Sequence, residues 1–353
     1  TAPAEPSFHV HKTADESDIL VKIYENTLSV KLINPSGNLN LIDNELNIAA
    51  CAVAVNHSNL ALFVNSTLIG QTATGDYSDL IDLSSYPAGQ HWIKAVATAA
   101  KATARDSVSF FIRPAATVAD LPVGLHPGIN YVNESTVTLV LHDPPTLKEH
   151  VFVIGDFNGW SLTTAAYMNE TTDGKYFWKT ITGLTPGTEY AYQYYIDGEL
   201  KLADPYCDKV LDPWNDQYIS STIYPNLKRY PSGQTTGIVS VLQTNQEDYN
   251  WEVTNFSKPD NRDLVIYELH IRDFVASDDI KDVTAKLDYL QRLGVNAIEL
   301  MPVNEFEGND SWGYNPSFYF APDKAYGTKN DYKHFVDECH KRGMAVIIDM
   351  VLN

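Results

Sequence analysis

The chain has 353 residues, which is too long for one ordinary sandwich domain and indicates two or three domains. Its 44% hydrophobic and 20% charged residues are typical of folded protein and exclude disordered and fibrous classes. No window approaches the roughly 18 to 20 unbroken apolar residues of a membrane-spanning helix. The formal net charge of −20 repels phosphate groups, so nucleic acid and anionic membranes are unsuitable partners. Neutral substrates are compatible with this charge.

The three cysteines lie far apart and show no spacing typical of metal ligands, so we interpret them as buried free thiols. They are Cys51, Cys207 and Cys339. The chain begins Thr1-Ala2-Pro3, without a basic and then apolar leader. We therefore expect either that a targeting segment has been removed or that the sequence is a piece of a longer protein.

Short alternations of apolar and polar residues, separated by turn residues, fill the first part of the chain. This period of two is typical of half-buried strands. We predict an antiparallel, immunoglobulin-like β-sandwich over residues 1–120. The pattern favours a spacer or docking module there, and binding of a glycan or a protein is the alternative.

A second β-rich block, rich in Tyr, Trp and Phe, predicts another sandwich over residues 121–232. Between its strands lies a glycine-bounded loop, Gly155–Trp160. An exposed indole there suits a sugar, whose C–H faces are apolar and whose hydroxyls need polar partners, so Trp160 is a candidate glycan platform. Packing of Trp160 on the sandwich core is the alternative. The polar residues 233–262 are predicted to be a linker.

Residues 263–353 change to the pattern strand, helix, strand, helix, strand. Apolar runs predict strands over residues 264–270, 295–301 and 344–352, and helices are predicted over residues 282–292 and from near residue 330 to the stop signal Arg342-Gly343. This order predicts parallel pairing with right-handed crossovers. A barrel of eight β/α units needs about 250 residues, so only three units fit here. An apolar last strand with no covering helix is unusual in natural proteins. We therefore expect this chain to be the N-terminal fragment of a larger protein.

Active sites of parallel barrels lie at the carboxyl ends of the strands. Four places qualify: His270 with Arg272-Asp273, Asn304-Glu305, the loop around Tyr314, and Asp349–Asn353. An acid in an apolar strand, as at Asp349, is costly to bury without a partner or a role. Tyr314 offers a ring and a hydroxyl to a sugar, with core packing as the alternative. For His270 and Asp273, the alternative to a role in the site is a structural, hydrogen-bonded pair.

Several of these stretches resemble the start of the catalytic barrel of the α-amylase family of glycoside hydrolases. The stretches, in chain order, are Tyr267-Glu268-Leu269-His270-Ile271-Arg272-Asp273-Phe274, Trp312-Gly313-Tyr314-Asn315-Pro316, Tyr326-Gly327-Thr328 and Asp349-Met350-Val351-Leu352-Asn353. The block with Gly155–Trp160 and Ala203-Asp204-Pro205-Tyr206 resembles the starch-binding-like, early-set sandwich before the barrel in pullulanases and branching enzymes. The fold expected for the whole chain is therefore two antiparallel β-sandwiches followed by the first three β/α units of a (β/α)8 TIM barrel.

The resemblance implies substrate-binding roles for Tyr314 and Asp349, to which we add His270. It implies hydrogen bonding or calcium ligation for Asn353; no cofactor is otherwise required. Retaining glycosidases use two carboxyl groups about 5 to 5.5 Å apart. The resemblance places both of them after Asn353, so no catalytic residue is expected in this chain and the chain alone is expected to be inactive. Against glycogen-binding relatives, Gln193 and Leu200 replace a Lys and a Trp, which weakens the prediction of a platform at Trp160.

The favoured hypothesis is a retaining hydrolase of α-1,4-glucans such as starch and malto-oligosaccharides. Debranching of the pullulanase type, or glucan branching, is the alternative within enzymes. A non-catalytic glycan-binding or docking module is the alternative from another class. Similarity to polysaccharide enzymes that carry tandem sandwich modules predicts an extracytoplasmic place: secreted, periplasmic or on the cell surface. The pattern predicts no oligomeric state.

Overall fold

The structure is a computed structural model that describes residues 7–10, 19–22, 27–35, 39–42, 47–73 and 75–352. The chain forms two compact units. The first unit comprises residues 1–115 with 162–165, and the second comprises residues 116–161 with 166–353. The domain boundaries expected from the sequence stay predictions.

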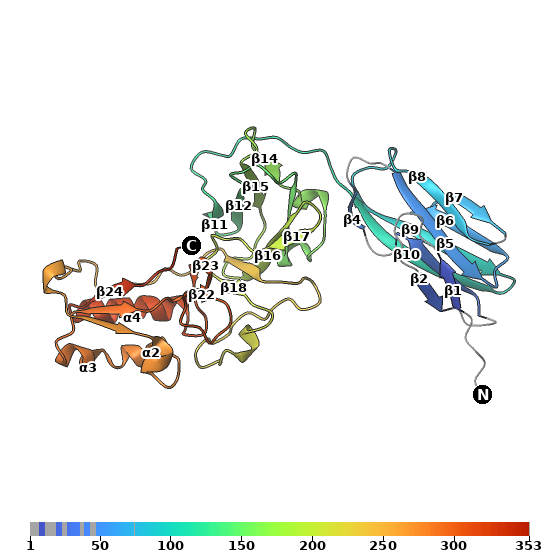
Figure 1. The fold of residues 1–353 in the computed structure, drawn as a ribbon. Helices are drawn as coiled ribbons and strands as arrows, with labels where there is room; N and C mark the ends of the chain where they lie inside the picture. The colour runs from blue at the N-terminus through green and yellow to red at the C-terminus, as the bar shows by residue number, and fades with distance from the viewer. Residues whose placement is uncertain are drawn as a thin grey trace, which may run out of the picture. The chain divides into compact units, whose positions relative to one another are not determined.

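The first unit holds two sheets that share one core (Figure 1). Its larger sheet has the order β4 (Leu39–Ile42), β10 (Ala102–Ile112), β9 (Gly89–Ala99), β6 (Asn59–Val64) and β7 (Thr67–Thr72). The second sheet has the order β3 (Ser29–Asn34), β5 (Asn47–Val55) and β8 (Tyr77–Asp82), and β1 (Ser7–Val10) pairs with β2 (Ile19–Lys22). Leu32 and Ile48 of one sheet pack with Leu62, Ile93 and Phe110 of the other. The sequence pattern predicted a wholly antiparallel sandwich. This is wrong for one pair of strands, because β4 runs parallel to β10.

The second unit begins with a sandwich of antiparallel sheets. One sheet has the order β11 (Gly128–Asn133), β12 (Thr136–His142), β15 (Tyr176–Ile181) and β14 (Asn169–Glu170). The other has the order β13 (Val151–Gly155), β16 (Glu189–Ile196), β19 (Val239–Gln243) and β18 (Val210–Leu211), with β17 (Leu200–Leu202) paired to β16. Alternate residues of both sheets fill the core between them, among them Leu139, Val153 and Phe177. The short 3-10 helices within the described residues are η1 (Asp156–Asn158), η2 (Thr164–Ala166), η3 (Asp216–Tyr218) and η4 (Asn261–Asp263).

The prediction of a linker over residues 233–262 is wrong for the segment Val239–Gln243. This segment forms β19, which lies between β16 and β18 and is almost wholly buried. The apolar residues of β19 complete the sheet that also contains β16 and β18. The chain therefore contributes one more strand to the sandwich before the parallel sheet begins.

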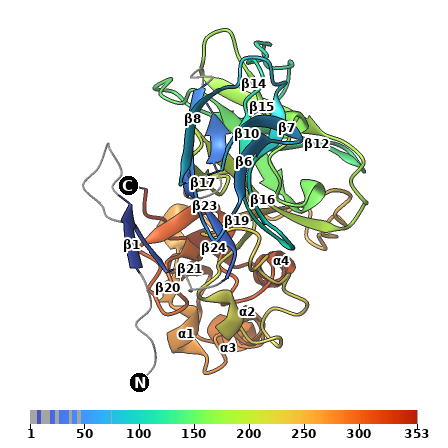
Figure 2. The ribbon, with the colours of Figure 1, turned by 90° about the vertical axis from the view of Figure 1, so that its right-hand side faces the viewer.

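A parallel sheet of β20 (Ile266–Leu269), β21 (Ala297–Leu300) and β24 (Ala345–Ile348), with β21 in the centre, follows the sandwich. The connecting helices are α1 (Ile271–Phe274), α2 (Ile280–Thr284), α3 (Leu287–Arg292) and α4 (Lys329–Lys341). These helices lie beside the sheet in both ribbon views (Figures 1 and 2). Buried residues of α2, α3 and α4, such as Val283, Leu290 and Phe335, share a core with Ile298 of the central strand. The three predicted parallel strands are confirmed, each shorter than its apolar run.

The helix predicted over residues 282–292 is interrupted. Helix α2 ends at Thr284 and α3 begins at Leu287, so the two turns bury Val283 and Leu287 but leave Leu293 exposed. Helix α4 agrees with its sequence signals: the Thr328 side chain accepts from the backbone N–H of Asp331, and Gly343 follows the helix at φ 72°. None of the helices in the described part of the chain has the length and apolar character needed to cross a membrane.

Candidate functional site

The side chains of Tyr314 and Asp349 meet at the carboxyl end of the parallel sheet. The Tyr314 hydroxyl donates to Oδ2 of Asp349 over 2.6 Å. Asp349 directly follows β24, whereas Tyr314 lies in the loop between β22 (Asn304–Phe306) and β23 (Pro316–Pro322). The hydrogen bond to Asp349, together with desolvation and nearby negative charge, raises the pKa of the Tyr314 phenol to about 12. The pair therefore offers a neutral hydroxyl and a carboxylate side by side, 42% of Tyr314 being exposed.

Two further carboxylates lie on the same face of this sheet. Glu268 of β20 and Glu299 of β21 are aligned in register, and Glu299 is in turn aligned with Ile347 of β24. Because side chains alternate along a strand, Asp349 continues the face of Ile347. Both glutamates contribute to the raised pKa of Tyr314, so they lie within electrostatic range of its hydroxyl. They were not among the candidates from the sequence, although each is a single acid within an otherwise uncharged strand, the same signal that selected Asp349.

His270 lies behind the loop that carries Tyr314. Its ring is 6% exposed, and Nε2 lies 3.2 Å from the carbonyl oxygen of Ser311 and 3.1 Å from the hydroxyl of Tyr326. Its Nδ1 lies 3.2 Å from Oδ2 of Asp273 but has no hydrogen-bond partner among the described residues, so the two side chains are close without forming the hydrogen-bonded pair considered from the sequence. These contacts make His270 a positioning residue for the loop. Direct contact between His270 and a substrate stays a prediction.

The loop is fastened at three further points. Arg272 forms an ion pair with Asp310 over 3.1 Å. The Ser311 hydroxyl donates to the side chain of Asn315. At Gly313, with φ 86°, a Cβ atom would lie 2.4 Å from the carbonyl oxygen of Pro302, so no other residue fits there without movement of the loop. The position of Tyr314 is thus set by contacts on both sides of it.

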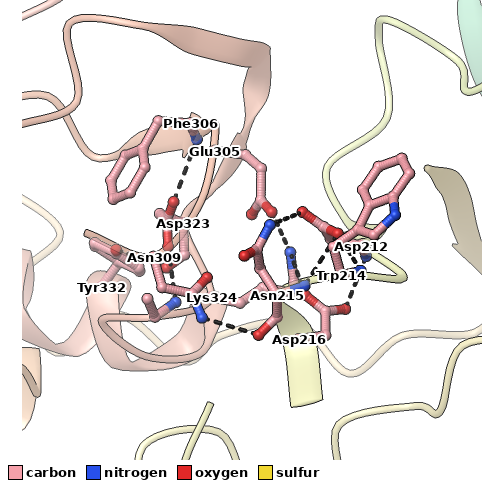
Figure 3. A network of polar contacts seen from close by, with 11 residues as sticks. Asp212, Trp214, Asn215, Asp216, Glu305, Phe306, Asn309, Asp323, Lys324 and Tyr332 are labelled. Carbon is pink, nitrogen blue, oxygen red and sulfur yellow. Dashed lines mark hydrogen bonds and ion pairs between the residues drawn. The ribbon is translucent and has the colours of Figure 1, made fainter. Parts of the chain in front are cut away.

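A buried network of charges holds the base of the same hairpin (Figure 3). The Lys324 ammonium contacts Glu305 and lies 3.3 Å from Oδ1 of Asp216, and all three groups are nearly inaccessible to solvent. Asp323, next to Lys324, accepts hydrogen bonds from the backbone N–H groups of Phe306 and Ala325. This network joins the hairpin to the loop after β18.

One ammonium faces three buried carboxyl groups in this network. Burial raises the pKa of Asp216, Glu305 and Asp323, most strongly that of Asp323, where the charge of Glu305 adds to the effect. Although burial alone would lower it, the three carboxyl groups raise the pKa of Lys324. The lysine therefore stays charged. Glu305 was a candidate from the sequence but Lys324 was not, because lysine is almost never fully buried.

Trp160 is half-buried in the sandwich. It packs against a cluster of buried residues of the second sheet that includes Val239, and its indole N–H donates to Oδ1 of Asp156 over 2.9 Å. This arrangement agrees with the alternative of core packing. Gln193, one of the replacements noted in the sequence, is fully buried and bonded to the loop at Thr235, whereas Leu200 is half exposed. The role of Trp160 as a glycan platform stays a prediction.

The metal prediction rested on Asn353, which lies outside the described residues. Among the residues that the structure describes, no group of three or more His, Cys, Asp or Glu side chains is arranged to hold a metal ion. The three cysteines are free, as predicted, with Cys51 partly exposed.

Residues 223–353 match the family model described as the alpha amylase catalytic domain. The chain is 33% identical over 192 residues to malto-oligosyltrehalose trehalohydrolase of Saccharolobus solfataricus, covering 54% of this chain and 30% of that protein. It is 31% identical over 192 residues to chloroplastic isoamylase 1 of Arabidopsis thaliana, covering 45% of this chain and 23% of that protein. The chain thus spans less than a third of the length of these relatives.

Among solved structures, a mutant of pullulanase from Paenibacillus barengoltzii, complexed with maltotetraose, aligns with 65% of this chain and 38% of its own. The sequence identity is 21% and the TM-score is 0.48.

Proposed function

The chain belongs to the α-amylase family through its residues 223–353, and from this premise we propose that the protein hydrolyses α-1,4-glucans such as starch and malto-oligosaccharides with net retention. The hydrogen-bonded pair of Tyr314 and Asp349 carries the proposal. An exposed phenol ring supplies an apolar face for a sugar, and the carboxylate beside it accepts hydrogen bonds from sugar hydroxyls. In this proposal Tyr314 and Asp349 bind the sugar that is cleaved.

Retaining cleavage needs a carboxylate nucleophile and a carboxylic acid about 5 to 5.5 Å apart. We assign neither role to a residue of this chain. Because the chain spans less than a third of its relatives, we propose that both groups are supplied by further residues of the protein. The 353-residue chain alone is then inactive on amylose.

The proposed architecture follows the same family. Each sandwich is assigned to the immunoglobulin-like class, and the three parallel strands with their helices form the first units of a (β/α)8 barrel. The proposed domains are residues 1–120 and 121–232, the lead-in 233–262 and the barrel part 263–353. We further propose an extracytoplasmic place for the protein, by analogy with polysaccharide enzymes of similar modular order.

The decisive experiment uses a longer form of the protein that contains the whole catalytic domain. Release of reducing ends from amylose, with the α-anomer formed first, is the expected result. The conservative variant Tyr314→Phe is expected to lower kcat/KM about ten-fold, equivalent to about 1.4 kcal/mol of lost binding in the transition state. Tyr218→Phe, which alters an exposed tyrosine, serves as the matched control and is expected to leave kcat/KM unchanged. Equal activity of the two variants would remove Tyr314 from the site.

The second candidate is cleavage or transfer at α-1,6 branch points, which the match to isoamylase 1 favours. Pullulan and amylose distinguish the two candidates. Faster cleavage of pullulan indicates debranching, and new branches on amylose without net hydrolysis indicate branching. Rapid shortening of amylose with slow action on pullulan supports the favoured proposal.

A further inference from the structure

A cavity lies at the start of helix α4, in the same compact unit as Tyr314 and Asp349. Its volume is about 580 Å³, within the range of about 300 to 1,000 Å³ typical of small-molecule sites. The walls come from β16, β19 and the loop before β18 in the sandwich, and from the segment between β23 and α4 beside the parallel sheet. The residues that line it are distinct from Tyr314, Asp349 and Trp160.

The charges that line this cavity are balanced. Three lysines stand against three acids, namely Lys209, Lys324 and Lys329 against Glu189, Asp208 and Glu247. Each lysine is already paired. Lys209 contacts Glu189 over 2.6 Å, Lys329 contacts Asp208 over 2.7 Å, and Lys324 contacts Glu305 and Asp216 in the buried network.

Paired charges favour a neutral ligand over an anion. Phosphate and carboxylate ligands are held by cationic side chains, most often arginine, whose N–H donors are available to the ligand. Here an anion would have to displace Glu189 or Asp208 from its lysine. A hydroxyl group can instead donate to the carboxylate of such a pair without breaking it, because a carboxylate has about four acceptor sites.

The remaining lining residues fit a polyhydroxylated molecule. Side-chain amides of Asn245 and Asn330 can both donate and accept hydrogen bonds. The amides of Gln243 and Gln246 are already bonded within the protein, Gln243 to the carbonyl oxygen of Gly187 and Gln246 to Lys329, so they form polar walls of the cavity. The half-buried ring of Tyr224 adds apolar surface, which suits the C–H faces of a pyranose. The Lys209 ammonium lies 4.8 Å from the centroid of the Tyr224 ring and so fixes that ring in place.

We propose that this cavity, formed by the sandwich and the start of helix α4, is a second binding site for a neutral oligosaccharide, separate from the site of Tyr314 and Asp349. The choice of an α-glucan as the oligosaccharide rests on the proposed function. Binding here would hold a polymeric substrate on the sandwich side of the enzyme while another part of the same polymer is cleaved. Its benefit is an increased effective concentration of the chain being cut.

The first test is hydrogen exchange of the wild-type chain with and without maltopentaose, which needs no variant. Slower exchange is expected in residues 187–189, 243–247 and 327–330. The second test is calorimetric titration with maltopentaose in a Trp160→Ala/Tyr314→Ala background, which removes the other two candidate sugar contacts. Binding is expected to persist there and to weaken at least ten-fold when Tyr224→Ala or Asn330→Ala is added. Unchanged thermal unfolding of these variants shows that the fold is kept.

Each other outcome overturns the proposal. Loss of all binding in the background variant assigns the sugar to Trp160 or Tyr314. Protection by inorganic phosphate, or competition by phosphate against maltopentaose, makes the cavity an anion site. The result is independent of catalysis: binding here without glucan hydrolysis by the longer protein contradicts the proposed function alone, and hydrolysis without binding here contradicts the second site alone.

Discussion

The ammonium of Lys324 lies 3.3 Å from Oδ1 of Asp216, so a lysine of the hairpin region and an acid of the loop after β18 are joined in a place nearly closed to solvent. The two residues are separated by more than a hundred positions in the chain. Because Asn309 of the hairpin loop also donates to the carbonyl oxygen of Asn215, over 2.9 Å, the contact fixes the loop that carries Tyr314 against the sandwich. The position of the candidate site thus depends on a buried ion pair outside it.

Lys324→Met is expected to destabilise the protein strongly. The substitution keeps the volume of the side chain but leaves Glu305 and Asp216 buried without a cation, and breaking a buried pair in this way costs about 3–5 kcal/mol. Chemical unfolding followed by circular dichroism measures the loss. Lys341→Met is the matched control, because Lys341 also contacts two acids, Glu252 and Glu338, but at the surface. Its effect is expected to be much smaller. Equal losses in the two variants would contradict the role given to burial.

Gly313→Ala is expected to displace the loop that carries Tyr314. A methyl group at this position meets the Pro302 carbonyl oxygen at 2.4 Å, in addition to the strain of an alanine at φ 86°. Gly308→Ala in the same loop is the control, because it has a similar φ of 81° but nothing within 4 Å of the added Cβ. The control is expected to cost about 1–2 kcal/mol of unfolding free energy from backbone strain alone. Gly313→Ala is expected to cost about 1–3 kcal/mol more from the steric contact. Similar costs in both variants would show that the loop adjusts freely.

Elements with local signals, such as capping residues, could be predicted from the sequence. Elements whose burial depends on strands distant in the chain could not. Helix α4 was predicted with nearly its true end, since Arg342 and Gly343 form a local stop signal. Strand β19 was missed because its five residues lie in a polar segment and gain their burial from partners distant in sequence, namely β16, β18 and the core between the two sheets. The same holds for the candidate site. Tyr314 and Asp349 were each selected by their place after a strand, but their hydrogen bond depends on how a loop folds across 35 positions.

Asp337 of α4 is expected to make the stability of the protein depend on pH in the acid range. Its buried carboxylate accepts from the backbone N–H groups of Glu252 and Val253, each over 2.9 Å, and so ties the lead-in of the chain to the helix. Burial acts to raise its pKa, but these hydrogen bonds and that from Tyr249 outweigh burial, so the pKa of Asp337 is lowered below its ordinary value. A lowered pKa stabilises the folded state above the unfolded value of about 4, and this contribution is lost as the pH falls through the folded value.

The variant Asp337→Asn removes this linkage. Wild type is expected to be more stable than the variant near neutral pH, and the difference is expected to shrink as the pH falls below about 4. Urea unfolding at a series of pH values measures both free energies. A difference that stays constant across the series would show that Asp337 acts only through packing.

The final prediction concerns the titration of Tyr314. Since the hydrogen bond to Asp349 is the largest cause of the raised pKa, Asp349→Asn is expected to move the Tyr314 phenol from about 12 toward its ordinary value of 10. A raised pKa means that the neutral phenol stabilises the folded state below about pH 10, and that this contribution is lost between about pH 10 and 12. The chemical shift of tyrosine Cζ, followed by NMR during a pH titration, reports each ring, and Tyr314→Phe identifies the signal. Asp310→Asn is the control, because it loosens the same loop from Arg272 but keeps Asp349. If the control lowers the pKa of Tyr314 as much as Asp349→Asn does, the position of the loop sets this pKa and the hydrogen bond does not. A pKa of Tyr314 near 10 in the wild-type protein would exclude the hydrogen-bonded pair altogether.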